Sequence, residues 1–560
     1  MRLAWRRLMD EAGAAVESVG VAGGWRRGLQ TAMGQVMDAT VSEPPRLIRR
    51  IGALPRWATL LAALGAGALS ALAFQPVGTI AGPVLGVGLL LILLVQAPAG
   101  RSFGLGLLFG FGNFVIGLSW IATAFTYQGE MPVWMGWVAV VGLSLFLALY
   151  PALAAWAARR LTDRIVPLAL LFAGLFALTE ILRGTLFSGF AWNPLGAGWL
   201  QLPGVAQLAA LVGANGLSAL AVLAGGSLAA LLGARGEAGR LGLVLLFPLL
   251  LALGLVVPRV QAPLPPDTAT RLLLVQTGTR IEDKYGENGL ERSLERAVLQ
   301  TRAALGEGPV PAAVIWPEAT IEYPLEDMPG LGATLTQGFA PGTLLLSGGI
   351  AIERDADGGV TGARNSLYAL DHRGTILARY DKAHLVPGGE YLPLRAIAEP
   401  LGLARLVPGS LDFLPGPGAT TWRLPGLPTV APNICYEIIF PGAVVERGVQ
   451  PGFILTVSND AWFGRSGPPQ HHAQARLRAI EEGVPVVRVT PTGISGVIDA
   501  RGGLGVTLPT GGAAQAIVNV PAALAATPFS RAGLAAPGLF AFALIGLGAW
   551  LRRRPTDKKT

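Results

Sequence analysis

The chain of 560 residues contains one cysteine, Cys435, and a carboxylate follows it two positions later at Glu437. A lone cysteine after an apolar run is often a small buried hydrophobic residue, whereas a thiol beside a base can be a nucleophile. A single cysteine excludes an intramolecular disulfide framework. The residue types in the neighbouring stretches therefore decide between packing and chemistry.

Two other stretches place reactive side chains after apolar segments. Glu318 follows a short apolar run, and Lys382 and Glu390 lie in a Gly/Pro-rich stretch, 379–393. A thiol needs a base to become a thiolate, and a tetrahedral oxyanion needs a positive charge or hydrogen-bond donors. Glu318, Lys382 and Cys435 can supply these roles without histidine, although each alone is also compatible with an ordinary loop or core residue.

The four histidines do not form a metal-binding pattern. Two of them, His471 and His472, are adjacent at the start of an expected helix, and the others, His372 and His384, are far from them in the sequence. For the adjacent pair, capping and hydrogen bonding are expected in preference to metal ligation. No metal ion and no cofactor are predicted.

The composition indicates a membrane protein. The chain is 52% hydrophobic and 14% charged, with a mean hydropathy of +0.51, whereas a soluble domain has about 25% charged residues. The net charge of +8 is explained by cationic cytoplasmic loops and does not require nucleic acid as a partner.

Eight apolar segments are long enough to cross about 30 Å of hydrocarbon. The predicted transmembrane helices are 58–75, 79–98, 103–126, 133–157, 165–186, 205–233, 241–258 and 533–551.

The loops between these segments alternate in charge, which predicts the orientation of the helices. Loops with arginine (Arg101; Arg159, Arg160 and Arg164; Arg235 and Arg240) alternate with two loops, 127–132 and 187–204, that contain neither Lys nor Arg. Because cationic loops stay in the cytoplasm, both termini are predicted inside. The segment between the seventh and eighth helices is then extracytoplasmic.

Strand-like apolar runs alternate with helical stretches after the Pro265-Pro266 pair, which predicts an α/β layered domain with its own core. The predicted domains are a basic cytoplasmic tail (1–56), a seven-helix membrane domain (57–260), an extracytoplasmic catalytic domain (261–525), the eighth transmembrane helix (530–552) and a basic cytoplasmic tail (553–560).

The order of Glu318, Lys382 and Cys435 resembles the Glu-Lys-Cys triad of the nitrilase superfamily. Further motifs resemble the apolipoprotein N-acyltransferase family over about residues 57–552: Ser458-Asn459-Asp460-Ala461-Trp462-Phe463-Gly464, Gln470-His471, Arg478-Ala479-Ile480-Glu481, Thr492-Gly493-Ile494-Ser495, Glu180 to Arg183, and Gly189-Phe190-Ala191-Trp192-Asn193-Pro194-Leu195-Gly196. This resemblance implies an α-β-β-α sandwich inserted between membrane helices 7 and 8.

The resemblance also implies a reaction and its partners. An acyl chain passes from a phospholipid, with phosphatidylethanolamine expected, to the cysteine as a thioester. It then passes to the α-amino group of the diacylglyceryl-cysteine at the N-terminus of an apolipoprotein. In this assignment Glu318 accepts the proton, Lys382 stabilises the oxyanion and Cys435 is the nucleophile. The expected location is the bacterial inner membrane with the catalytic domain in the periplasm, and a monomer is expected.

The resemblance assigns supporting roles to five further residues. Glu390 orients Lys382 or supports the base, and Tyr436 and Glu437 shape the acyl pocket or position the thiol. Tyr285 aligns with a tryptophan found in many family members at the lipid-entry side, and Trp462 is either a core residue or a lipid contact. These last four form the predicted substrate-binding set.

Two features of the motifs bear on their local structure. The chain has Pro491-Thr492-Gly493 where the family usually has Asn-Thr-Gly, so a backbone donor and a side chain are lost there. Arg183 is expected to pair with Glu180 one helical turn away, in preference to binding a phospholipid head group.

Two other functions are compatible with parts of this pattern. A membrane-tethered nitrilase-like amidase would hydrolyse a C–N bond and would need water at the thioester, because a fold does not fix the reaction type. A transporter or scaffold with a ligand-binding outer domain would not need Cys435 at all.

Overall fold

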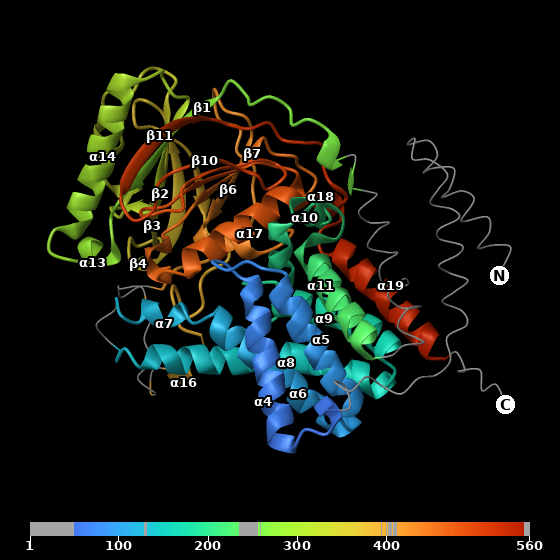
Figure 1. Ribbon diagram of the computed structural model, residues 1–560. Helices are drawn as coiled ribbons and strands as arrows, with labels where there is room; N and C mark the ends of the chain where they lie inside the picture. The colour runs from blue at the N-terminus through green and yellow to red at the C-terminus, as the bar shows by residue number, and fades with distance from the viewer. Residues whose placement is uncertain are drawn as a thin grey trace, which may run out of the picture.

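The computed structural model describes residues 50–127, 131–233, 256–393 and 395–553, with the exception of 258, 399, 401–405 and 407–411. Figure 1 shows a bundle of helices beneath a layered domain of sheets and helices. Most of both predicted tails, and nearly all of the helix predicted at 241–258, lie outside the described residues.

The helical part contains six helices that are long and apolar enough to cross a membrane, among the residues described. These are α4 (Arg56–Ser70, continued by the 3-10 turn η1, Ala71–Ala73), α6 (Ser102–Gly117, preceded by η2, Ala99–Arg101), α8 (Met135–Leu161), α9 (Ile165–Arg183), α11 (Ala209–Gly233) and α19 (Ala535–Arg552). A seventh apolar helix, α5 (Ala81–Gln96), is shorter. All seven fall on segments predicted to be helical, because each is an uninterrupted apolar run.

Two of the predicted helices are broken. The segment predicted as 103–126 ends as a helix at Gly117 and resumes as the short α7 (Ile121–Ala124). The amide nitrogen of Asn193 donates a hydrogen bond to the Gly117 carbonyl (3.1 Å), which satisfies a carbonyl that the helix would otherwise use.

The segment predicted as 205–233 divides into α10 (Pro203–Ala206) and α11, and α11 bends at Gly213, where φ is +65°. A β-carbon at this position would lie 2.5 Å from the ring of Phe529. Glycine is required there both for the left-handed backbone and for the close approach of this ring.

The layered domain contains two sheets. The first has the order β11-β1-β2-β3-β4-β5: β11 (Ala513–Asn519), β1 (Arg271–Thr277), β2 (Ala313–Ile321), β3 (Leu344–Arg354), β4 (Val360–Leu370) and β5 (Ile376–Asp381). The second has the order β10-β9-β8-β7-β6: β10 (Leu504–Thr507), β9 (Gly496–Ile498), β8 (Val486–Val489), β7 (Phe453–Val457) and β6 (Val430–Ile434). β1, β2 and β3 are parallel, as are β6, β7 and β8.

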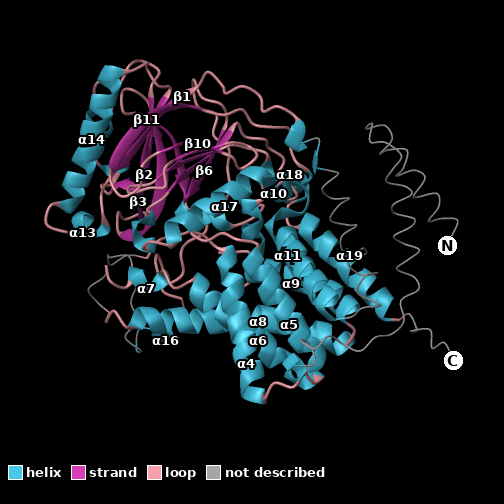
Figure 2. Cartoon of the chain, in the orientation of Figure 1, coloured by secondary structure: helices cyan, strands magenta, loops and turns pink. Residues whose placement is uncertain are grey.

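The two sheets pack face to face between two helices (Figure 2). Leu274 and Ile315 of the first sheet share one buried cluster with Phe453, Leu455 and Val487 of the second. The long helix α14 (Gly289–Glu307) covers the outer face of the first sheet, and α17 (Gly467–Glu482) covers the second. The order of layers is therefore α-β-β-α. The alternation of short apolar strands and helices predicted a layered α/β domain, and the resemblance to the family implied this particular order.

The layered domain lies in the chain between α11 and α19 and rests on one end of the helical bundle. α17 forms the junction, because Ala473, Leu477 and Ile480 belong to the same buried cluster as side chains of the membrane helices. Short elements complete the chain: α13 (Ile281–Lys284), α15 (Leu331–Leu335), α16 (Arg395–Ala398), α18 (Pro528–Ala532), and the 3-10 turns η3 (Leu195–Gln201), η4 (Leu325–Asp327), η6 (Cys435–Ile439) and η7 (Asp460–Phe463).

Candidate active site

Cys435 is the first residue of the 3-10 turn η6, directly after the last residue of β6. Its side chain is buried and its φ is +49°, in the left-handed region that non-glycine residues rarely occupy. Such a conformation persists only where its surroundings hold it. One restraint is a ring nitrogen of His471, Nε2, which lies 3.1 Å from the Cys435 carbonyl oxygen.

Glu318 lies within β2, at a point where the pairing of β2 with β3 is irregular between Trp316 and Ile321. The backbone amide of Asn459 donates to its Oε2 (2.6 Å), and the side-chain amide of Asn365 donates to its Oε1 (2.8 Å). The carboxylate is buried, and these two donors fix its orientation. The same oxygen Oε1 lies 3.6 Å from the ammonium nitrogen of Lys382.

Lys382 directly follows β5 and is only 1% exposed. Its ammonium forms an ion pair with Glu390 (2.9 Å). Burial alone would lower the pKa of Lys382, but the nearby negative charges of Glu390 and Glu318 outweigh it and raise the pKa. Lys382 therefore carries a fixed positive charge at neutral pH, as an oxyanion partner must.

Asn365, in the middle of β4, connects the two carboxylates. Its side-chain nitrogen donates to Glu318 (2.8 Å) and to Glu390 (2.9 Å). Glu390 also accepts a hydrogen bond from the backbone amide of Val386 (2.8 Å). Glu318, the Lys382 ammonium and Glu390 thus form one buried hydrogen-bonded group.

Burial raises the pKa of the Cys435 thiol well above its ordinary value, and the negative charge of Glu318 raises it further, while the positive charge of Lys382 lowers it. At rest the thiol is therefore protonated. Two carboxylates raise the pKa of this thiol, and the effect of Glu318 is larger than that of Asp460.

Glu437 has a different position from the one predicted for a substrate-binding residue. Its carboxylate accepts hydrogen bonds from the Tyr380 hydroxyl (2.7 Å) and from the backbone amides of Ala383 (2.8 Å) and Ile434 (2.8 Å). It does not line the cavity described below. Two roles were expected for Glu437, shaping the acyl pocket or positioning the thiol, and these contacts fit only the second. Glu437 ties the turn of Cys435 to the segment that follows Lys382.

A cavity of about 610 Å³ lies in front of Cys435. It is lined by Glu318, Lys382, Glu390 and Cys435, and also by Tyr436, Tyr285 and Trp462. The structure therefore brings seven of the eight predicted site residues to one cavity. Its remaining walls include apolar side chains from the membrane part: Trp120, Ile121, Phe125, Leu143, Phe146, Leu186, Phe187, Phe190 and Trp192.

The aromatic residues of the predicted substrate-binding set lie on different walls. The rings of Tyr285 and Trp462 lie near each other, with centroids 6.0 Å apart. The Tyr436 hydroxyl donates to the carbonyl of Gly189, in the loop after α9 (3.1 Å). Tyr436 thus joins the nucleophile turn to the membrane part.

Three groups near the thiol were not predicted to act at the site: Asn365, the backbone amide of Asn459, and His471 together with Asp460. His471 was expected only to cap or hydrogen-bond. Its Nδ1 lies 2.9 Å from Asp460 Oδ1, and Arg488 donates to the other oxygen of Asp460 (2.5 Å). No cluster of potential metal ligands is present in the part of the chain that the structure describes.

The loop motif 189–196 of the membrane part contacts the layered domain directly. The Trp192 indole nitrogen donates to the side-chain oxygen of Gln470 (2.9 Å), and its ring stacks on His471 with centroids 5.1 Å apart. Arg183 donates to the Trp192 carbonyl (2.8 Å) and lies 3.7 Å from Glu180, the predicted pair.

Pro491, which departs from the family pattern, does not line the large cavity. Its carbonyl accepts a hydrogen bond from Gly278 (2.7 Å). Because proline has no backbone N–H, position 491 lacks a hydrogen-bond donor. This missing donor lies away from the large cavity.

Comparison with known proteins supports both halves of this architecture. The model of the apolipoprotein N-acyltransferase N-terminal domain matches residues 66–227, and the carbon-nitrogen hydrolase model matches residues 333–527. A nitrilase-type α/β domain carried by apolar membrane helices defines the class of the protein, a membrane-bound member of the carbon-nitrogen hydrolase group.

The relatives identify the family. The apolipoprotein N-acyltransferase of Allorhizobium ampelinum is 37% identical over 473 residues, which cover 82% of this chain and 89% of that protein. That of Brucella melitensis is 36% identical, covering 82% and 88%, and that of Rhodopseudomonas palustris is 35% identical, covering 89% and 96%. The chain belongs to the apolipoprotein N-acyltransferase family.

Proposed function

We propose that this protein transfers a fatty acyl chain from a phospholipid to the α-amino group of the N-terminal S-diacylglyceryl-cysteine of lipoproteins, through a thioester on Cys435. One observation carries the proposal: the cavity that contains Glu318, Lys382 and Cys435 is walled on its other side by apolar side chains of the membrane part. Both substrates are lipid-anchored, and such a cavity accepts acyl chains.

In the first half of the reaction, Glu318 accepts the proton of the Cys435 thiol as the sulfur attacks the ester carbonyl of the phospholipid. The carbonyl oxygen becomes an oxyanion, which the Lys382 ammonium stabilises. When the tetrahedral intermediate collapses, the ester C–O bond breaks and the leaving alkoxide takes the proton from Glu318. A lysophospholipid departs and the acyl chain stays on sulfur as a thioester.

In the second half, the α-amino group of the acceptor attacks the thioester carbonyl. Glu318 accepts a proton from the attacking nitrogen, and Lys382 again stabilises the oxyanion. The C–S bond breaks, the thiolate takes the proton back, and an amide remains on the acceptor. This order of steps is a ping-pong mechanism, in which one triad serves both halves.

The remaining residues of the cavity have supporting roles in this mechanism. Glu390 and Asn365 hold Lys382 and Glu318 in place through the contacts described above. Tyr285 and Trp462 provide an aromatic wall for the acyl chains. No cofactor is required, since the donor ester already carries the energy of the transferred bond.

The apolar walls favour transfer over hydrolysis, which was the alternative predicted from the sequence. A hydrolase must admit water to the thioester, whereas a transferase must keep water away until the amine arrives. Apolar side chains such as Phe125, Leu143 and Phe146 line the cavity, and walls of this kind disfavour water beside the thioester.

Formation of the acyl-enzyme tests this function directly. Purified full-length protein in detergent is incubated with phosphatidylethanolamine labelled in its acyl chains, and we expect a hydroxylamine-sensitive adduct on Cys435. Cys435→Ala should form none. Glu318→Ala and Lys382→Ala should slow adduct formation by roughly 10²–10⁴-fold, the range for loss of a general base or an oxyanion partner. An equal adduct in Cys435→Ala would refute the function, and full acylation of the other variants would refute their roles.

The proposal includes a location and an orientation. The protein lies in the inner membrane as a monomer, with the layered domain in the periplasm and both termini in the cytoplasm. The alternating charge of the loops supports this orientation. It places the thiol on the side of the membrane where exported lipoproteins are displayed.

A further inference from the structure

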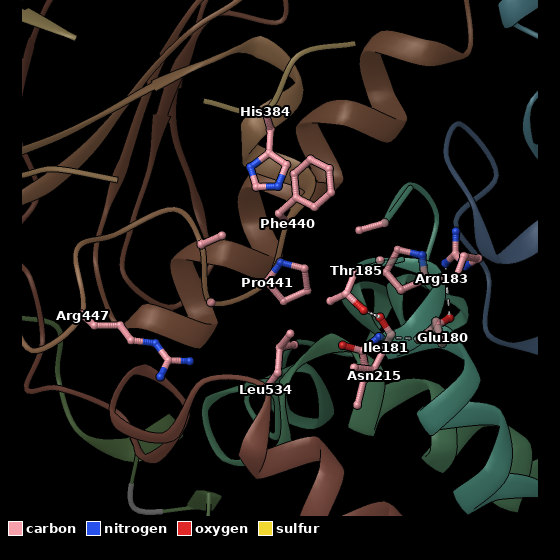
Figure 3. Close-up of a pocket in the computed structure, with 15 residues that line it drawn as sticks. Glu180, Ile181, Arg183, Thr185, Asn215, His384, Phe440, Pro441, Arg447 and Leu534 are labelled. Atoms are coloured by element: carbon pink, nitrogen blue, oxygen red, sulfur yellow. Dashed lines mark hydrogen bonds and ion pairs between the residues drawn. The ribbon is translucent and has the colours of Figure 1, made fainter. Parts of the chain in front are cut away.

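A second, smaller cavity lies behind the turn that carries Cys435. Its volume is about 220 Å³, and Figure 3 shows the residues around it. Phe440 and Pro441, which follow η6, form one wall, whereas Cys435 and Tyr436 at the start of η6 face the large cavity. Arg183 is the one described residue that lines both cavities. The small cavity is therefore a separate space.

The inner wall of the small cavity contains a buried acceptor without a donor. Asn215, in α11, is 4% exposed and its side-chain nitrogen donates to Glu180 (3.0 Å). Its side-chain oxygen is buried and has no hydrogen-bond partner among the residues that the structure describes. Leaving a buried acceptor unpaired is costly, so a ligand with an N–H or O–H group would gain by reaching it.

The outer side of the cavity carries a cation. Arg447 is exposed, and no ion pair or hydrogen bond joins it to another described residue. In Figure 3 it lies across the cavity from Glu180 and Arg183, whose charges offset each other as an ion pair. Burial lowers the pKa of His384, so this residue adds no charge at neutral pH. The charge of the cavity is therefore positive, which favours an anionic group.

The cavity lies at the ends of two membrane helices that face the layered domain. Thr185 follows the end of α9, and Leu534 immediately precedes α19. Large apolar side chains on the same two helices are exposed: Leu182 at 44%, Leu539 at 71% and Phe542 at 62%. The cavity is thus at the height where lipid head groups lie, and apolar surface for acyl chains continues from it.

We propose that this small cavity binds the head group of a glycerophospholipid that is not the acyl donor. Arg447 contacts the phosphate, a head-group ammonium or hydroxyl donates to the Asn215 side-chain oxygen, and the acyl chains lie along α9 and α19. Free phosphate would satisfy only Arg447. The site goes beyond the proposed acyl transfer, since its lipid does not meet Cys435.

Native mass spectrometry of the full-length protein in detergent tests this site. Wild type and variants are titrated with phosphatidylethanolamine, and separate samples receive glycerophosphoethanolamine or inorganic phosphate. Arg447→Gln removes the cation, and Ala443→Leu enlarges an exposed side chain on the cavity wall. Arg423→Gln, an exposed arginine that lines neither cavity, is the matched control.

We expect wild type to retain one lipid more than Arg447→Gln and Ala443→Leu. In Arg447→Gln the lipid should bind about fivefold more weakly, because one cation–phosphate contact is lost. Arg423→Gln should behave as wild type, and all three variants should form the Cys435 adduct at the wild-type rate. Equal lipid retention in Arg447→Gln and wild type would overturn the proposal, as would competition by inorganic phosphate alone.

Loss of both the lipid and the adduct in folded Arg447→Gln would assign the cavity to the acyl donor and would also overturn the proposal. If wild type forms no adduct but Arg447→Gln still loses one lipid, the acyl-transfer function fails and the second lipid site stands.

Discussion

The reactivity of Cys435 is governed by two neighbours of opposite charge. Glu318 raises the pKa of the thiol and Lys382 lowers it, while burial contributes the largest increase. The carboxylate that is expected to take the proton is therefore also one reason why the proton stays on sulfur at rest.

These two effects of Glu318 predict that Glu318→Gln will speed alkylation of Cys435 and slow formation of the acyl adduct. Removal of the negative charge lowers the pKa of Cys435, so more thiolate is present at a given pH and alkylation by iodoacetamide should be several-fold faster. Acyl-adduct formation should fall by roughly 10²–10⁴-fold because the proton acceptor is lost. Alkylation rates and adduct yields measured between pH 7 and pH 10 check both. A parallel fall of both rates would contradict the assignment of Glu318 as the base.

Asn365 is predicted to position both carboxylates. In Asn365→Leu, Glu318 and Glu390 each lose a donor, and we expect kcat to fall about a hundredfold with little change in KM, since misplacement of a reacting group has about this effect. Ser366→Ala is the control, because the neighbouring side chain contacts Asp381 and does not line the cavity. An unchanged kcat in Asn365→Leu would leave the residue with a structural role only.

The contribution of single residues could be predicted only where a motif marked them. Glu318, Lys382 and Cys435 each lie in a recognisable stretch and follow or interrupt an apolar strand. Asn365 lies between Arg364 and Ser366 in the middle of a strand, where a polar residue is ordinary. Its contact with two carboxylates depends on β4 lying beside β3, a pairing that the sequence does not specify.

Among the secondary-structure elements, the positions of the helices and strands could be predicted from apolar runs in the sequence. The points at which helices bend or end early could not. The chain contains 76 glycines, so Gly213 has no feature in the sequence that distinguishes it as the bend of α11. The bend arises from a contact between distant segments: the Phe529 ring occupies the space of a β-carbon, and the Glu481 carboxylate accepts a hydrogen bond from the backbone amide of Ala214 (2.6 Å).

The bend of α11 predicts a loss of stability in Gly213→Ala. The added methyl group meets the Phe529 ring at 2.5 Å and the backbone has a φ of +65°, so we expect the free energy of unfolding to fall by about 1–3 kcal/mol. Gly538→Ala in α19 is the control, because its β-carbon meets no atom within 4 Å. The midpoints of thermal unfolding in detergent provide the measurement, and equal midpoints for both variants would contradict the expectation.

For the whole molecule, the loop charges predict on which side of the membrane each part lies. In a Cys435→Ala background, Thr361→Cys places a thiol on the layered domain, and Asp163→Cys places one in the cationic loop between α8 and α9. A membrane-impermeant maleimide should label the first in intact spheroplasts and the second only after lysis. Labelling of the second in intact cells would reverse the orientation.

Contacts of Trp192 limit how freely the membrane helices and the layered domain could be exchanged between related proteins. The ring of Trp192 stacks on His471, and the Nε2 atom of His471 lies beside the Cys435 carbonyl oxygen. The indole nitrogen of Trp192 donates a hydrogen bond to the side chain of Gln470. A chimera that joins this layered domain to the membrane helices of a distant relative would therefore have to retain residues 187–194 as well. For protein engineering, the natural point of exchange is not the domain boundary in the sequence but the outer edge of that loop.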